Sequence, residues 1–351
     1  MPAPVSHMLP LTTVRRARLL QNPGRVLVRT GQMVTATDVI AETYLPEHHY
    51  LLDVRRTLGI SSVNKAAGLI QRREGEKVQK GDVIAETGGL FSRVIRAPQD
   101  GVVVSVNAGQ VWIEALGEPF KLRAGMPGTV TDVIADRGAI LETSAALVQG
   151  VWGNGLIDLG VLLSLARTPD DELTRDRLDV SMRGAVVLGG YCDKPDVLKA
   201  AADLQLRGLV LAGINPNILR AAAALKFPLI VIEGFGRIPF NPTAYRLLTS
   251  NEKRDAALNA AAWDAYTGER PEVVIPLPAA GGDPAPDTLE FSAGQNVRLH
   301  GAPYLGQTGT IIALRGGSAA LQNGLRAPAA DIRLENGERV LIPLANLDVL
   351  E

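Results

Sequence analysis

The sequence predicts a multidomain fold in which a β-rich domain, a small parallel α/β domain and a β-barrel follow one another. Three observations support this order. A glycine-led motif occurs twice near the start, β-branched runs alternate with alanine-rich stretches in the middle, and a glycine-rich strand-loop-strand pattern stands near the end. Because 351 residues exceed what one hydrophobic core usually supports, we expect domains at 1–150, 151–278 and 289–351, with a linker at 279–288.

The composition is that of a folded protein, with 46% hydrophobic and 21% charged residues. The formal net charge is −1 and no predicted domain is strongly basic, so we do not expect nucleic-acid binding except within a ribosome or polymerase complex. The sequence contains no signal peptide pattern and no apolar run of the ~18 residues that a membrane helix needs. We therefore predict a cytoplasmic protein without membrane contact.

The chain has a single cysteine, Cys192, which excludes a disulfide within the chain. We interpret Cys192 as a small buried hydrophobic residue rather than a nucleophile. The adjacent residues His48 and His49 would point to opposite faces of a strand, which does not favour a shared metal. We therefore assign no metal site.

The motif Gly-x-x-Val-x-x-x-Asp-Val-Ile-Ala-Glu-Thr occupies residues 31–43 and returns at residues 75–87. Each copy alternates apolar and polar residues behind a glycine turn, which indicates short strands with one buried face. A unit of this size cannot bury its apolar face alone, so we expect the two copies to pack on each other.

The second copy continues into Ala97-Pro98-x-x-Gly101-x-Val103, and residues 96–106 match residues 123–133 in turn. Together these motifs resemble the biotinyl/lipoyl-type barrel-sandwich hybrid, over about residues 22–150. Carrier domains of that family hold a modified lysine at a hairpin tip, whereas the two tips expected here read Tyr44 to His49 and Gly88-Gly89-Leu90-Phe91-Ser92. The resemblance without the lysine implies a docking or structural part, and we expect no cofactor.

The middle segment alternates strands and helices, which is typical of βαβ units around a parallel, Rossmann-like sheet. Expected strands are 185–188, 209–211, 229–232 and 272–276, and expected helices are 195–206, 217–225 and 254–266. Continuous apolar strands indicate that both faces of the sheet are covered.

Ligands of such sheets bind beyond the carboxyl ends of the strands. The loops at those ends carry Asp193, Asn215, Glu233 and Arg237, which are our candidate ligand-binding residues. The same loops are also explained by turn chemistry, with Asp193 and Asn215 as helix caps. Glu233 fits that second interpretation least well, because it closes a fully apolar strand.

The C-terminal residues Gly294 to Ile312 resemble the KOW motif of SH3-like barrels, and the tail contains a hairpin pattern through Asn336-Gly337. Family members bind RNA, ribosomal proteins or polymerase, which implies a partner in gene expression. The module is net acidic, and Tyr304 and Phe291 are too few exposed aromatic residues for a stacking platform, so a protein partner is favoured over RNA.

We favour a non-enzymatic cytoplasmic adaptor or scaffold that docks protein partners or forms a homo-oligomer through its β modules. The sequence spells no carrier lysine, nucleophile elbow or phosphate loop, and we assign no catalytic residue. One alternative is an enzyme or small-ligand-binding protein with its site at the strand ends. Another is a transcription- or ribosome-associated factor that acts through the KOW-like module. The partner, the oligomeric state and the arrangement of the three domains stay open at this point.

Overall fold

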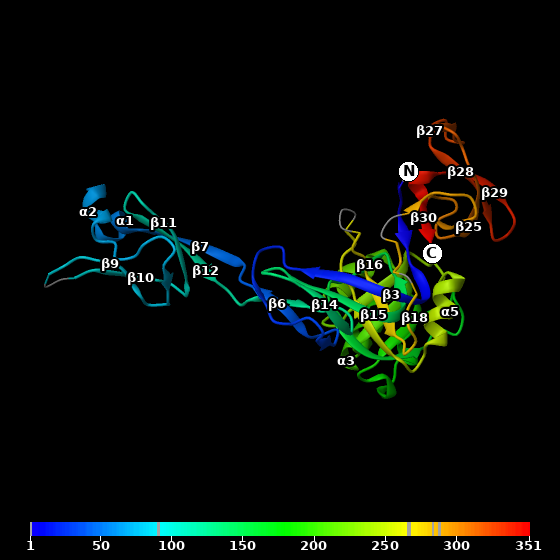
Figure 1. Ribbon diagram of the computed structural model, residues 1–351, viewed down its shortest axis with the longest axis horizontal. Coiled ribbons are helices and arrows are strands. Elements are labelled where there is room, and N and C mark those ends of the chain that lie inside the picture. The colour runs from blue at the N-terminus through cyan, green and yellow to red at the C-terminus, as the bar shows by residue number, and fades with distance from the viewer. Residues whose placement is uncertain (1, 90–91, 265–267, 283, 287–288) are drawn as a thin grey trace.

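The computed structural model of the chain describes residues 2–89, 92–264, 268–282, 284–286 and 289–351. Within these residues strands outweigh helices and form several separate sheets, which confirms a β-rich protein of several parts. Figure 1 shows a body at one end of the long axis and a narrower projection at the other. We call residues 46–116 the arm and the remaining residues the body. Among the helices described, none has the length and apolar character needed to cross a membrane.

A large mixed sheet runs through the body. Its strands are hydrogen-bonded in the order β16, β20, β19, β18, β17, β21, β22, β15, β14 and β5, and β3 also pairs with β15. In chain order they are β3 (Met8–Leu19), β5 (Met33–Val34), β14 (Gly128–Ile134), β15 (Gly138–Gln149), β16 (Trp152–Gly153), β17 (Ile157–Ser164), β18 (Val186–Cys192), β19 (Gly208–Ile214), β20 (Leu229–Phe235), β21 (Asp255–Asn259) and β22 (Glu272–Pro276). Because β15 pairs with β22, residues on both sides of position 150 share this sheet.

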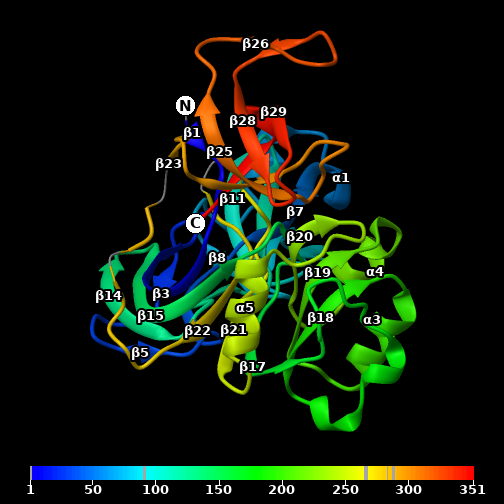
Figure 2. The same ribbon diagram turned by 90° about the vertical axis from the view of Figure 1, so that its right-hand side faces the viewer.

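Strands β17 to β20 are parallel neighbours, as the alternating pattern predicts. Helix α3 (Pro195–Asp203) follows β18, and a 3₁₀ turn with α4 (Leu219–Ala223) follows β19. Figure 2 shows these helices on one side of the strands and α5 (Pro242–Ser250) on the other. Both faces are therefore covered, and Val186 and Val187, which point to opposite faces, are fully buried.

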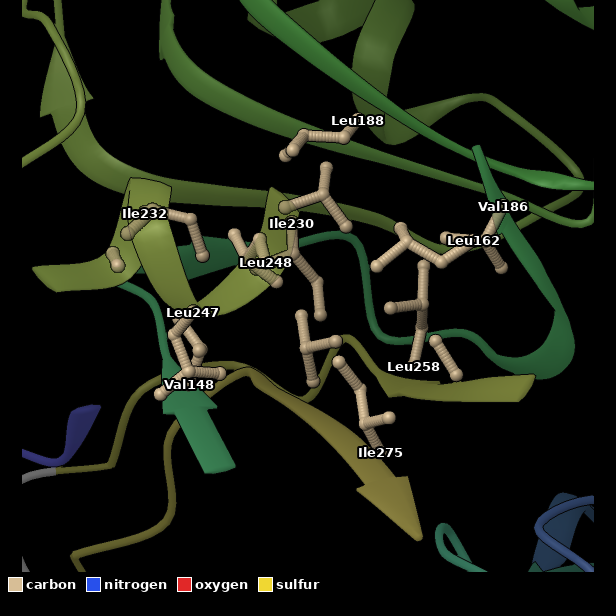
Figure 3. Packing of buried hydrophobic residues seen from close by; sticks show 14 of the residues in the cluster. Val148, Leu162, Val186, Leu188, Ile230, Ile232, Leu247, Leu248, Leu258 and Ile275 are labelled. Atoms are coloured by element: carbon tan, nitrogen blue, oxygen red, sulfur yellow. The ribbon is translucent and has the colours of Figure 1, made fainter. Parts of the chain in front are cut away.

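The core beneath α5 is built from branched aliphatic side chains of strands far apart in the sequence. Figure 3 shows Leu247 and Leu248 of α5 meeting Ile230 and Ile232 of β20, with Ile275 of β22 below. These side chains belong to one buried cluster, so the parallel strands and the antiparallel strand β22 share a hydrophobic core.

The prediction of a helix over 254–266 is wrong for its described part. Residues Asp255–Asn259 form strand β21, which lies between β17 and β22. Ala256, Ala257 and Leu258 are buried on alternate faces of the sheet, so packing on both sides overrides the helix preference of alanine. Residues 265 and 266 lie outside the described part of the chain.

The duplicated motif forms two units that are nested in the sequence. In the first copy β6 (Val39–Thr43) pairs with β13 (Phe120–Arg123), and β5 pairs with β14. In the second copy β9 (Val83–Glu86) pairs with β10 (Val94–Arg96), and β8 (Lys77–Val78) pairs with β11 (Gly101–Asn107). The whole second copy is thus inserted between β6 and β13 of the first, and the match of 96–106 to 123–133 reflects the same pairing in both copies.

The two copies agree down to individual hydrogen bonds. The Gly31 N–H donates to the Val130 carbonyl at 2.8 Å, and the Gly75 N–H donates to the Val103 carbonyl at 2.8 Å. Each copy buries its own core: Ile40, Leu122 and Val130 lie in one cluster, and Ile84, Ile95 and Val103 in another. The expectation that the copies pack on each other is therefore wrong, because each closes on the strands that follow its own motif.

The segment expected as the first hairpin tip is a strand instead. Residues Pro46–Asp53 form β7, which pairs with β12 (Gln110–Leu116) and leads into α1 (Val54–Leu58) and α2 (Val63–Ala67). This difference follows from the insertion, because the position of a tip in the first copy is where the chain enters the arm. Leu90 and Phe91 of the other expected tip lie outside the described residues.

The C-terminal segment forms a sheet with the order β2, β30, β24, β25, β28 and β29. Its strands are β2 (Val5–Ser6), β24 (Asn296–Leu299), β25 (Thr308–Leu314), β28 (Ala329–Leu334), β29 (Arg339–Pro343) and β30 (Leu347–Leu350). The hairpin through Asn336-Gly337 is confirmed, with Gly337 in the left-handed region at φ 87°. The N-terminal strand β2 completes this sheet, and β1 (Pro2–Ala3) pairs with β23 (Leu289–Glu290). Residues 283, 287 and 288 of the expected linker lie outside the described residues.

Candidate functional site

The carboxyl ends of β18 and β19 bring Asp193 and Asn215 together. The Asn215 side-chain amide donates to Asp193 Oδ1 at 3.0 Å, and the Tyr191 hydroxyl donates to the same oxygen at 2.9 Å. These hydrogen bonds, that of Tyr191 first, hold the pKa of Asp193 below its ordinary value. Asn215 also caps the next turn, since its side chain accepts from the Asn217 N–H at 3.0 Å. Asp193 does not cap α3, whose N-cap is Lys194.

Arg237 joins this group through two residues that the sequence did not single out. Its guanidinium donates to Glu172 Oε2 at 2.8 Å and lies 5.6 Å from the centre of the Tyr191 ring. Burial, followed by the hydrogen bond to Asp193, raises the pKa of Tyr191 to about 12. Tyr191 is therefore a neutral hydrogen-bond donor at physiological pH, and Arg237 is already neutralised by Glu172.

A small cavity lies beside this cluster. It has a volume of about 140 Å³ and is lined by Asp170, Asp171, Tyr191, Arg237, Ile238 and Pro239. Pockets that enclose drug-sized ligands usually measure roughly 300–1,000 Å³, whereas one water molecule takes about 30 Å³. The space therefore suits a few water molecules or a very small ion.

Glu233 is not part of the strand-end cluster that contains Asp193 and Arg237. Its side chain is 1% exposed and accepts from Arg298 Nη1 at 2.7 Å, from the Asn241 backbone N–H at 2.8 Å and from the Asn241 side chain at 2.7 Å. Glu233 thus turns away from the strand-end cluster and toward β24 of the C-terminal sheet. The structure brings together Asp193, Asn215 and Arg237, and separates Glu233 from them.

Arg298 is the centre of a buried ionic network. Its side chain is 0% exposed, and its Nη2 donates to Asp348 Oδ2 at 2.9 Å and to the Ser6 hydroxyl at 3.2 Å. Arg270 approaches Asp348 from the other side at 3.3 Å. The network therefore ties β20, β24, β30 and the N-terminal strand β2 at one point.

The charges of the network determine one another's protonation. Burial alone would lower the pKa of Arg298, but the carboxylates of Glu233 and Asp348 outweigh it and raise that pKa. Burial alone would likewise raise the pKa of Asp348, but Arg298 and Arg270 hold it below its ordinary value. Both groups are therefore ionised in the folded protein at neutral pH.

The C-terminal sheet also covers the strand-end edge through its KOW-like loop. A β-carbon on Gly306, whose φ is +77°, would lie 2.6 Å from Ile238 Cγ2, so the loop backbone rests directly on the loop that follows β20. The loop at Gly306 is therefore covered by the α/β unit of the same chain. Phe291, expected as an exposed aromatic, is buried in the core of the C-terminal sheet because β23 places it there beside Val297 and Ile311.

The C-terminal sheet also carries an open groove of about 460 Å³. Tyr304, Ile312, Arg315 and Arg339 are among its lining residues, and Arg315 is paired with Asp331 at 2.8 Å. The groove is lined by apolar groups and by charged groups of both signs.

The arm exposes apolar side chains on the outer face of its main sheet. This sheet has the order β7, β12, β11, β8. Trp112 lies opposite Leu51 in the β7–β12 pair, and the two residues are 42% and 46% exposed. Val104, which lies at an irregularity of β11, is 41% exposed. Alternate residues such as Val111 and Ile113 face the arm core and are fully buried, so the exposed set belongs to the outer face alone.

Cys192 and His49 are the other residues that the sequence offers as reactive groups. Cys192 is 0% exposed, and burial raises the pKa of its thiol to about 12, which agrees with a buried hydrophobic role. His49 lies on β7 with its Nε2 3.6 Å from Glu114. Within the described ranges no cluster of three or more histidine, cysteine, aspartate or glutamate residues is arranged to hold a metal ion.

The chain matches no protein-family model and no curated protein sequence.

Proposed function

We propose that this protein is a non-enzymatic cytoplasmic adaptor. Its body is a rigid base, and its arm, which resembles a lipoyl-type domain without the carrier lysine, binds a partner protein. The observation that carries the proposal is the outer face of the arm, where Trp112 and Leu51 are exposed opposite each other. Figure 1 shows that the arm projects from the body. Aromatic residues of this kind are typical anchors of protein interfaces.

The charge of the arm supports a protein partner. The arm, residues 46–116, contains nine basic and eight acidic residues, so its excess of positive charge is too small to bind a run of phosphates. A nearly neutral surface with an apolar centre fits the composition of a protein interface.

The buried network supports the rigid body that this function requires. Arg298 joins β24 and β30 of the C-terminal sheet to β20 through Glu233 and Asp348, which supports a rigid connection between the two predicted modules. The arm, which has its own hydrophobic core, is then held out from a stable base.

Site-specific photocrosslinking tests the proposal. A photoreactive phenylalanine analogue in place of Trp112 is expected to give a discrete crosslinked species in cells, identified by mass spectrometry. The same analogue in place of Met33, which is 82% exposed on the body, serves as the control and should give none. Equal crosslinking at both positions, or none at either, would contradict the proposal.

A second candidate function is small-ligand binding at the strand ends. It is favoured by the small cavity that Tyr191 and Arg237 line, and by the hydrogen bonds that join Tyr191 and Asn215 to Asp193 beside it. A thermal-shift screen against nucleotides, sugar phosphates and carboxylates addresses it, with Asp193→Asn as the matched variant. A ligand that raises the melting temperature of the wild type but not of the variant would support this site. If no compound in the screen raises the melting temperature of the wild type, ligand binding at the strand ends is contradicted.

A further inference from the structure

Strand β7 has a free edge. It is the first strand of the arm sheet, and β12 is its neighbour on one side only among the described residues. The Val54 N–H donates to the Gly109 carbonyl at 3.0 Å, and pairing continues in register to His49 and Glu114. Because main-chain groups alternate in direction along a strand, those of Val54, Leu52 and Tyr50 point to β12. Those of Asp53, Leu51 and His49 therefore point away from the sheet.

The same three residues place their side chains on the outer face, together with Trp112. A strand that adds to this edge would thus bond to the main chain of His49 and Leu51 and would also cover the exposed side chains of Leu51 and Trp112. At Asp53, which caps α1, only the N–H is available, because the carbonyl of an N-cap residue accepts the first hydrogen bond of its helix. Such an unprotected edge beside an apolar face is a template for another strand.

One register makes the edge complementary to itself. In an antiparallel pair of two β7 strands with the two-fold axis at Leu51, each Leu51 lies opposite its counterpart. His49 then lies opposite Asp53 of the other copy, which sets an imidazole beside a carboxylate that also accepts from the Arg56 N–H of its own chain at 3.0 Å. The neighbouring register, centred on Tyr50, would instead set His49 against Leu51 and lose both matches.

We infer that two copies of this chain associate through β7, antiparallel and centred on Leu51, to form one continuous sheet across both arms. The inference rests on the proposed docking function of the arm and names its partner, a second copy. In the dimer the two Leu51 and two Trp112 side chains form one apolar cluster, flanked on each side by His49 and Asp53. The Leu51 contact lies on the axis and the His49–Asp53 contact occurs twice, as an isologous interface requires.

The shape of the molecule allows this association. β7 runs along the arm away from the body, as Figure 1 shows, so antiparallel strands place the two bodies at opposite ends of the paired arms. Each arm carries nine basic and eight acidic residues, so the net repulsion between two arms is small.

Disulfide trapping of the full-length chain tests the register. Paired residues on the axis have Cα atoms about 5.5 Å apart, within the range of a disulfide. Leu51→Cys is therefore expected to form a covalent dimer under mild oxidation. Val63→Cys, at a position 37% exposed on the same arm, and His49→Cys, whose copies would be about 13 Å apart, should stay monomeric. Equal crosslinking of all three variants, or none of Leu51→Cys, would overturn the inference.

Sedimentation of the uncrosslinked protein gives an independent measurement. The wild type is expected to dimerise, and Leu51→Lys, which sets two ammonium groups against each other on the axis, should weaken dimerisation at least tenfold. Val104→Lys changes an equally exposed residue of the same face away from the edge, and should retain the dimer. Circular dichroism confirms that both variants are folded.

The test separates this inference from the proposed function. A monomeric wild type that still crosslinks to a different protein at Trp112 would overturn the self-pairing and leave the adaptor function in place. A dimer that is indifferent to Leu51→Lys would overturn pairing through β7.

Discussion

Arg298 and Glu233 lie 65 positions apart in the sequence and form a direct ion pair, with Arg298 Nη1 2.7 Å from Glu233 Oε2. Both side chains are almost completely buried, at 0% and 1% exposure. Glu233 follows four apolar residues within β20 of the α/β unit, and Arg298 interrupts the apolar strand β24 of the C-terminal sheet. The pair is therefore the point at which the two units are specifically matched, because either charge alone would be costly to bury.

We predict that Arg298→Met strongly destabilises the protein. The substitution removes the cation that Glu233 and Asp348 share, and leaving buried charges without a partner costs about 3–5 kcal/mol. Chemical denaturation of the purified protein measures the free energy of unfolding. The control is Arg237→Met, which breaks an ion pair whose arginine is 62% exposed and should cost less than about 1 kcal/mol. Similar losses for the two variants would contradict the role given to the network.

The network also predicts how stability depends on pH. Arg298 and Arg270 outweigh burial and hold the folded pKa of Asp348 below the unfolded value of about 3.9. The stability that this group contributes is fully present above about pH 4 and is lost as the pH falls through the folded pKa. Urea denaturation between pH 2 and pH 7 should show this decline. Asp348→Asn should be less stable at pH 7 and should decline less steeply below pH 4; a slope unchanged by the substitution would refute the assignment.

The sequence predicted the local elements of the duplicated region well but not their arrangement. Alternation and glycine turns depend on neighbouring residues, so residues 39–43 and 83–86 were expected as strands and are strands. Which strand closes each unit depends on contacts such as Leu122 with Ile40, made across the whole inserted arm. A repeat within the sequence says nothing about nesting, and the expected packing of one copy on the other was therefore wrong.

In the candidate site too, the sequence predicts what depends on neighbouring strands and misses what depends on a distant unit. The parallel strand order brings Asp193, Asn215 and Arg237 together at the edge where parallel sheets gather their loops. Glu233 was misplaced because its partner lies in another unit. A signal was present: Arg298 and Asp348 are charged residues of opposite sign within apolar strands, as Glu233 is, and such residues need buried partners.

Cys192 provides a test of burial at the strand ends. Burial raises the pKa of the thiol to about 12, so at pH 8 only about one molecule in ten thousand carries the reactive thiolate. We predict that Ellman's reagent modifies native Cys192 at least ~1,000-fold more slowly than an exposed thiol introduced by Val63→Cys. Both thiols should react at similar rates in denaturant. Rapid modification of Cys192 in the native wild type would show that the end of β18 opens to solvent.

Separate cores in the two copies predict that the arm can be destabilised alone. A β-carbon on Gly101 would lie 2.5 Å from the Glu114 carbonyl oxygen, and one on Gly128, the matching residue of the first copy, 2.6 Å from that of Glu142. Gly101→Ala should therefore cost the arm about 1–3 kcal/mol through strand displacement. Hydrogen exchange should then show lost protection in β8, β11 and β12 but not in β15 or β22, and Gly128→Ala should show the reverse. Gly88→Ala, where a β-carbon meets nothing within 4 Å, is the control. Loss of protection throughout the chain in Gly101→Ala would mean that arm and body unfold as one cooperative unit.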